Sequence, residues 1–340
     1  MFQTILGNDH IKKYLQLAYK KNSLANSLLF IGADGIGKKL FAKELAYYLM
    51  FPNANDEALK KRVAENKHPD LHIYSPEGKS GMHSIANIRE LISQVFLSPF
   101  EAEAKVFIIY DAERMLPSSA NALLKTLEEP NLDSYIILLT TKESSLLPTI
   151  VSRCINLQFH PLSEKLVAKY LSDKLDKTPT ESQHIASISC GSIGMAEDIC
   201  AHPDYQNKKK LLLSILAESF SWSYVELAEA LEALDKLFVK EAQKEEVSEE
   251  STSVKWKKEV EFLLAQIAMW YRDLHLLKQE GDRQHLFFGD NLSMLQAQDI
   301  SALPPLEKIF EWIDEAKLGI DRNMKLITCL EVLFFKLGIV

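Results

Sequence analysis

The segment GADGIGK at Gly32–Lys38 has the residue types and spacing of a phosphate-binding loop. It follows an apolar run, Ser27–Ile31, and opens a stretch with helical periodicity, which is the setting that such a loop requires. Its glycines let the backbone curl so that N–H groups point inward, and the following helix N-terminus adds partial positive charge. The alternative is a plain glycine turn between a strand and a helix. The residues predicted to bind phosphate groups are Gly32, Gly35, Gly37 and Lys38.

The two positions that hold magnesium in such a site carry unsuitable residues. The residue after the loop lysine should offer a hydroxyl, but it is Lys39, whose ammonium repels a cation. The second position ends a later apolar strand, Val106–Ile109, where an Asp and then a Glu are expected; Tyr110 and Asp111 follow instead. A shift of frame by one residue would make Asp111 the ligand. Because phosphoryl transfer depends on positioning and charge neutralisation, we expect the chain to have lost most ATP hydrolysis of its own.

Length and composition indicate an ordinary globular protein. The chain has 340 residues, enough for roughly two to three domains, with 47% apolar and 25% charged residues. A formal charge of −8 argues against a surface built for nucleic acid. Four widely spaced cysteines form neither a disulfide framework nor a zinc motif, and they suit a reducing compartment. With no signal peptide and no long apolar span, we expect a cytoplasmic protein without a membrane segment.

Short apolar strands alternate with helical segments in the first half of the chain. The runs at Ser27–Ile31, Lys105–Tyr110 and Ser134–Thr140 have strand length and composition. They predict an α/β P-loop domain with a parallel sheet covered on both faces. The predicted domains are this P-loop domain at 1–161, a small helical lid domain at 162–205 and an all-α C-terminal domain at 206–340.

Nearly all of the chain beyond the predicted P-loop domain has helical periodicity. The helical segments of the lid are expected at Leu162–Leu175 and Thr180–Cys200, and those of the C-terminal domain at Leu211–Phe220, Tyr224–Ala242, Val254–Gln279 and Leu306–Leu337.

Several motifs resemble those of the clamp-loader subunits of bacterial DNA polymerase III, within the AAA+ ATPases. The specific ones are LLF at Leu28–Phe30, KVFII at Lys105–Ile109, NALLKTLEEP at Asn121–Pro130, TT at Thr140–Thr141 and SRC at Ser152–Cys154. Weaker matches are HPDLH at His68–His72, WYRD at Trp270–Asp273, RNM at Arg322–Met324 and LEV at Leu330–Val332. The resemblance therefore extends over essentially the whole chain.

Within that family, the chain looks like the delta-prime subunits rather than the ATP-hydrolysing motor subunits. The motor subunits carry an arginine in a G-S-x-R helix that senses the γ-phosphate, and Gly194 stands at that place in Gly191–Gly194. They also carry a four-cysteine zinc module, whereas Met50–Lys67 contains no cysteine. Some delta-prime proteins keep these cysteines, so their absence is a departure, and we predict no metal.

The resemblance implies that Arg153, with Ser152 beside it, serves a neighbouring subunit. In the family this arginine projects toward the ATP of the next subunit, where a guanidinium spreads positive charge over the transferring phosphate. The alternative is a surface arginine in an ordinary salt bridge. Glu128 and Glu129 precede Pro130 and are expected to close a helix rather than to act as an acid–base pair.

The implied function is that of a catalytically defective clamp-loader subunit within the DNA polymerase III holoenzyme, a nucleotidyltransferase complex. Its partners would be the motor (gamma/tau) subunits and the delta subunit, and indirectly the sliding clamp and primed DNA, with the C-terminal helices forming the oligomerisation collar. No cofactor is required, although weak ATP or ADP binding without magnesium ligands is expected. The rival hypotheses are a working ATPase motor and a DNA-binding regulatory module with a vestigial P-loop.

The segment His68–His72 alternates as H-x-D-x-H, which on a strand would place His68, Asp70 and His72 on one face. A metal site of these side chains is conceivable, but no fourth ligand is evident. We therefore predict that Asp70 and its neighbours anchor a loop. Cys154 is predicted to pack after Arg153 rather than to act as a nucleophile, since no histidine motif accompanies it.

Overall fold

The computed structural model describes residues 1–52, 54, 56–77, 81–129, 133–201, 204–218, 221–242, 252–282, 285–298 and 303–338. Pro130, the last residue of the NALLKTLEEP motif, lies outside these ranges. The chain divides into two compact units, Met1–Ala201 and His202–Val340. No helix in the described part of the chain is both long and apolar enough to cross a membrane.

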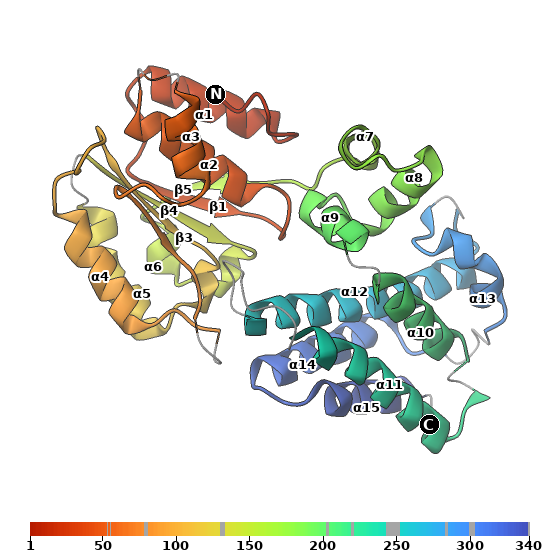
Figure 1. Ribbon diagram of the computed structural model, residues 1–340. Helices are drawn as coiled ribbons and strands as arrows, with labels where there is room; N and C mark the ends of the chain where they lie inside the picture. Colours follow the sequence, from red (N-terminus) through yellow and green to blue (C-terminus); the bar gives the residue numbers. More distant parts are fainter. Residues whose placement is uncertain are drawn as a thin grey trace. The chain divides into compact units, whose positions relative to one another are not determined.

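The first unit is built on a parallel sheet of five strands in the order β2-β3-β4-β1-β5 (Figure 1). The strands are β1 (Ser27–Ile31), β2 (Leu71–Tyr74), β3 (Lys105–Ile109), β4 (Ser134–Thr140) and β5 (Ile155–Gln158). Every residue of β1 and β3 is buried, as expected for apolar strands in the middle of a sheet. The strand that leads into the phosphate-binding loop thus lies between β4 and β5, and its carboxyl end opens at the edge of the sheet where parallel-sheet proteins bind ligands.

Helices cover both faces of this sheet, as Figure 1 shows. One face carries α1 (Asp9–Lys20), α2 (Lys38–Met50) and α3 (Glu57–Ala64); the other carries α4 (Ile85–Val95), α5 (Pro117–Glu128) and α6 (Pro148–Val151). Successive residues of β3 alternate between the two apolar layers, because side chains on a strand point to opposite faces. The predicted α/β P-loop fold with a parallel sheet is confirmed.

Three helices complete the first unit: α7 (Glu164–Leu175), α8 (Pro179–Ile188) and α9 (Ile193–Ala201). A capping box, in which Thr178 and Glu181 satisfy each other's backbone N–H groups, starts α8. These helices occupy most of the range predicted as a lid, and they belong to the same compact unit as the sheet. A separate domain at 162–205 stays a prediction.

The second unit is helical, and its described helices enclose one apolar core that includes the fully buried Trp270 and Tyr271. The helices are α10 (Asp204–Glu218), α11 (Tyr224–Ala242), α12 (Thr252–Lys278), α13 (Leu292–Gln296), α14 (Leu306–Asp321) and α15 (Leu326–Lys336). The prediction of one continuous helix at Leu306–Leu337 is wrong, because two helices, α14 and α15, occupy this range. The chain breaks after Asp321 because Asn323 takes the left-handed conformation (φ 63°), which asparagine tolerates better than most residues.

Candidate functional site

The phosphate-binding loop connects β1 to α2, as the sequence predicts. Gly35 and Gly37 have positive φ angles of 71° and 100°, which residues with a Cβ rarely adopt. Gly32 ties the loop to the sheet, since its N–H donates to the carbonyl of Thr140 at 3.1 Å. Among the described residues, no acceptor faces the N–H groups of Gly35, Ile36 and Gly37. The loop therefore offers three consecutive donors, the feature by which such loops bind phosphate.

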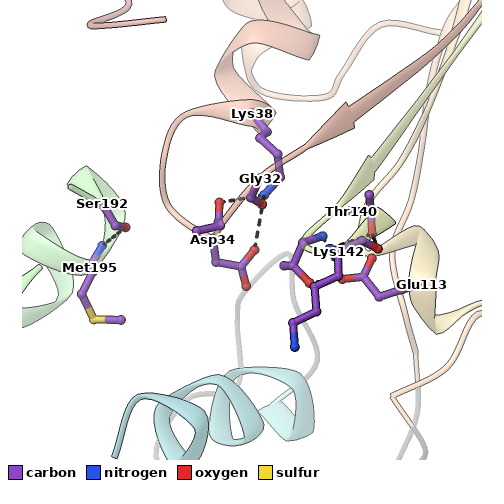
Figure 2. A network of polar contacts seen from close by, with 10 residues as sticks. Gly32, Asp34, Lys38, Glu113, Thr140, Lys142, Ser192 and Met195 are labelled. Carbon is purple, nitrogen blue, oxygen red and sulfur yellow. Dashed lines mark hydrogen bonds and ion pairs between the residues drawn. The ribbon is translucent and has the colours of Figure 1, made fainter. Parts of the chain in front are cut away.

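The loop lysine, Lys38, is buried and folded back onto its own loop (Figure 2). Its ammonium donates to the carbonyl of Gly32 and, at 2.8 Å, to that of Ala33. The carboxylate of Asp34 lies 3.8 Å from the same nitrogen. A phosphate group entering the loop would have to replace these contacts with its own, so the lysine's charge is partly satisfied before any ligand binds.

Lys39 lies against the ring of Tyr110, with 4.5 Å between its Nζ and the ring centroid. This is a cation–π contact, and the ring is almost wholly buried. Tyr110 continues the pairing of β3 with β2, because its N–H donates to the carbonyl of Tyr74 at 2.9 Å. The two residues that stand at the predicted magnesium positions are thus brought together, and the pair consists of an ammonium and an aromatic ring.

The start of α9 packs directly on the phosphate-binding loop. The N–H of Gly194 donates to the carbonyl of Gly35 at 3.0 Å. A Cβ added at Gly194 would lie 2.9 Å from the Cα of Gly35, closer than real Cβ atoms approach. Ser192 caps this helix, since its hydroxyl accepts from the N–H of Met195 at 3.1 Å (Figure 2). At Gly194 the chain thus has backbone packed on backbone.

Glu113 and Thr140 lie at the carboxyl end of β4, beside the loop (Figure 2). Glu113 accepts from the N–H of Thr141 at 3.1 Å and from its hydroxyl at 2.7 Å. The hydroxyl of Thr140 donates to the carbonyl of Lys142 at 3.1 Å and accepts from the N–H of Lys142 at 3.3 Å. Glu113 thus holds the end of β4 in place, and no sequence pattern predicts this contact.

Arg153 lies just beyond α6 and is anchored by two neighbours. Its Nε donates to the Oε1 atom of Glu128, its Nη2 lies against the same oxygen, and its Nη1 donates to the carbonyl of Thr149 at 2.8 Å. The side chain remains 30% exposed. Ser152 donates its hydroxyl to that same carbonyl of Thr149 at 3.2 Å. Ser152 therefore supports the turn that carries Arg153.

The segment His68–His72 anchors a loop. Asp70, fully buried, accepts from the N–H groups of Phe100, Glu101 and Ala102 at 2.6, 2.9 and 3.0 Å. Burial disfavours its charged form, yet these three donors keep the pKa of the carboxyl below its usual value. In the described part of the chain, no group of three or more His, Cys, Asp or Glu side chains could hold a metal ion.

Cys154 is shielded from solvent by the packing around it, and burial raises the pKa of its thiol to about 12. It packs against the apolar layer beneath α4, α5 and α6. A thiol with so high a pKa is almost entirely protonated near neutral pH, which makes it a poor nucleophile.

Comparisons with known proteins bear on the first unit above all. A sequence family described as "DNA polymerase III, delta subunit" matches residues 7–163, just under half of the chain. The delta' subunit of DNA polymerase III from Bacillus subtilis is 30% identical over 210 residues, covering 60% of this chain and 63% of the relative. The delta' subunit from Pseudomonas aeruginosa is 31% identical over 176 residues, covering 49% of this chain and 53% of the relative. The gamma/tau subunit from Mycoplasma genitalium is 32% identical over 203 residues, covering 56% of this chain and 34% of the relative.

The fold and the loop define an α/β P-loop domain, and the relatives support a clamp-loader subunit of DNA polymerase III, in the delta' or gamma/tau family. Within that class the findings support a delta'-like subunit. The resemblance seen in the sequence is confirmed over the part of the chain that these relatives match, and its extension over the whole chain stays a prediction. The chain spans less than two thirds of the length of the curated relatives that it matches.

Proposed function

We propose that this chain is a delta'-like clamp-loader subunit that hydrolyses no ATP itself and completes the ATP site of a neighbouring motor subunit with Arg153. The observation that carries the proposal is the contact between Lys39 and Tyr110. An ammonium and an aromatic ring stand at the two positions that should hold magnesium. A nucleotide in this loop would lack the metal that neutralises the transferring phosphate.

Arg153 provides the second half of the proposal. By the resemblance, this residue would correspond to the arginine that reaches the next subunit's ATP, and its partly exposed side chain is held at the guanidinium by Glu128 and Thr149. A planar guanidinium with paired donors suits a phosphoryl group better than a lysine ammonium does. A chain that has lost its own metal ligands and keeps this arginine is suited to act in trans.

The further parts of the proposal follow from the relatives. Motor (gamma/tau) and delta subunits would be the direct partners, and the helices of His202–Val340 would form the collar that joins them. The assembly would load a sliding clamp onto primed DNA in the cytoplasm. The three loop donors and Lys38 would bind ATP or ADP weakly, without protein ligands for magnesium.

Two experiments test the proposal. The isolated chain should show no magnesium-dependent ATP hydrolysis above background, because Lys39 and Tyr110 leave the metal without protein ligands. A turnover comparable to ordinary AAA+ motors, abolished by Lys38→Ala, would instead identify a working motor subunit.

The second experiment concerns the arginine. In a reconstituted assembly, Arg153→Ala should leave complex yield unchanged while clamp- and DNA-stimulated hydrolysis falls. Where it is the dominant charge donor, an arginine finger contributes about 10³–10⁵ in rate, but only one site of several would lose it. The total rate should therefore fall by a fraction, and Arg153→Lys should restore little of it.

A further inference from the structure

The guanidinium of Arg153 is held by two neighbouring residues. Glu128, the last residue of α5, meets Nε and Nη2 through one carboxylate oxygen. The carbonyl of Thr149, in α6, accepts from Nη1 at 2.8 Å. The side chain is thus held between the end of one helix and a turn of another, by contacts from residues 25 and 4 positions away in the sequence.

The contacts with Glu128 and Thr149 use only some of the N–H groups of the Arg153 guanidinium. A guanidinium carries five N–H groups: one on Nε and two on each terminal nitrogen. The contacts with Glu128 and Thr149 engage one N–H on each of the three nitrogens. Within the described residues, this leaves one N–H on Nη1 and one on Nη2. One N–H on each terminal nitrogen is therefore left for the oxygens of a carboxylate or phosphate.

We propose that Glu128 is a positioning residue, which orients Arg153 so that these two terminal N–H groups face the terminal phosphate of a nucleotide held by the neighbouring subunit. The inference rests on the proposed role of Arg153 in trans. Glu128 touches neither the nucleotide nor the reacting atoms. It acts by limiting the rotamers of a long side chain, whose freedom would otherwise have to be given up when the transition state forms.

Exposure argues against a purely structural role for this ion pair. The side chain of Glu128 is 47% exposed and that of Arg153 is 30% exposed. Ion pairs in such surroundings contribute little to folding stability. Removing the Glu128 carboxylate should therefore leave the fold and the assembly intact, and the effect should appear in the rate of hydrolysis.

The chain supplies a matched control in Glu129, the next residue. It is also an exposed glutamate at the end of α5, and no ion pair or side-chain hydrogen bond of Glu129 is found within the described residues. Glu128→Gln separates orientation from charge. Glutamine keeps an oxygen that can accept from Nε, while the negative charge that partly neutralises the guanidinium is removed.

The experiment uses the full-length chain reconstituted with its motor and delta subunits, the clamp and primed DNA. ATP hydrolysis is measured over a range of ATP concentrations for Glu128→Ala, Glu128→Gln, Glu129→Ala and Arg153→Ala, and for the Glu128→Ala/Arg153→Ala double variant. We expect Glu128→Ala to slow the site served by Arg153 about tenfold in kcat, with KM for ATP unchanged. A tenfold slower site loses about nine-tenths of its hydrolysis. The drop in the total rate caused by Glu128→Ala should therefore be about nine-tenths of the drop caused by Arg153→Ala.

The other variants complete the pattern. Glu128→Gln should match or exceed the parent rate, Glu129→Ala should match it, and the double variant should be no slower than Arg153→Ala alone. If Arg153→Ala lowers the rate while Glu128→Ala retains or exceeds the parent rate, the positioning role is overturned and the trans role stands. If Arg153→Ala itself changes nothing at unchanged complex yield, the proposed function fails, and this inference fails with it.

Discussion

A methyl group added at Gly194 tests whether the start of α9 really packs on the phosphate-binding loop. The added Cβ would lie 2.9 Å from the Cα of Gly35, whereas ordinary contacts begin at 3.4 Å. The two backbones would have to separate by the difference, 0.5 Å. That movement would stretch the 3.0 Å hydrogen bond from Gly194 to Gly35 to about 3.5 Å, the limit of a hydrogen bond.

The expected cost of Gly194→Ala is about 1–3 kcal/mol, the usual range for overpacking against atoms that cannot rotate away. Helix propensity predicts the opposite sign, because alanine in a helix is favoured over glycine by up to about 1 kcal/mol. The sign of the change therefore distinguishes a packed contact from an exposed helix position.

The assay must follow the first unit. All four tryptophans lie in residues 222–312, within the second unit, so their fluorescence reports on the wrong part of the chain. Amide hydrogen exchange of peptides from the loop and from α9 reports on the contact itself. Gly194→Ala should speed exchange in both peptides and lower the free energy of unfolding of the first unit. Exchange that is unchanged or slowed, with a gain in stability, would show that the contact does not exist in solution.

Three further predictions concern the magnesium positions, the buried Asp70 and the C-terminal helices. Combining Lys39→Thr with Tyr110→Asp should make nucleotide binding depend on magnesium, measured by titration calorimetry with magnesium or with EDTA; equal affinities in both would contradict the role of this pair. Asp70→Asn should cost about 1.5–3 kcal/mol in the free energy of unfolding, as expected for lost hydrogen bonds to a charged group. In the folded chain the pKa of Asp70 lies below its usual value of 3.8, so the parent should lose this stabilisation as pH falls below about 3.8. In urea titrations at several pH values, the Asp70→Asn variant should lack this part of the pH dependence of unfolding. A fragment of residues 1–205 should be soluble yet fail to co-purify with motor subunits; full incorporation into the complex would show that the C-terminal helices are not the collar.

The central strands of the sheet could be predicted from the sequence because they are buried on both faces. After their first residues, Ser27 and Lys105, the runs SLLFI and KVFII are wholly apolar, as expected for strands covered on both faces. β2 (LHIY) and β5 (INLQ) are short edge strands with polar residues, and their composition does not separate them from loop. The break at Asn323 was missed because the apolar periodicity continues on both sides of it.

The chemistry of the candidate site could be predicted residue by residue, but its contacts could not. The loop residues can be predicted from their types and spacing, whereas the role of Arg153 is implied only by the resemblance to the clamp-loader subunits. The contacts from Lys39 to Tyr110 and from Gly194 to Gly35 join segments that only the folded sheet and helices bring together. Glu128 was interpreted as a helix end, which it is; its contact with Arg153 depends on how α5 and α6 pack, and no sequence pattern indicates it.

The most direct test of the account compares two variants of this chain in one reconstituted clamp-loader assembly. ATP hydrolysis stimulated by clamp and primed DNA is measured for Lys38→Ala and for Arg153→Ala, at equal complex yield. The account predicts that Lys38→Ala, in the chain's own loop, keeps the parent rate, while Arg153→Ala lowers the rate by the share of one site. The reverse pattern, with Lys38→Ala slow and Arg153→Ala unchanged, would show that this chain hydrolyses ATP itself and does not complete a neighbour's site.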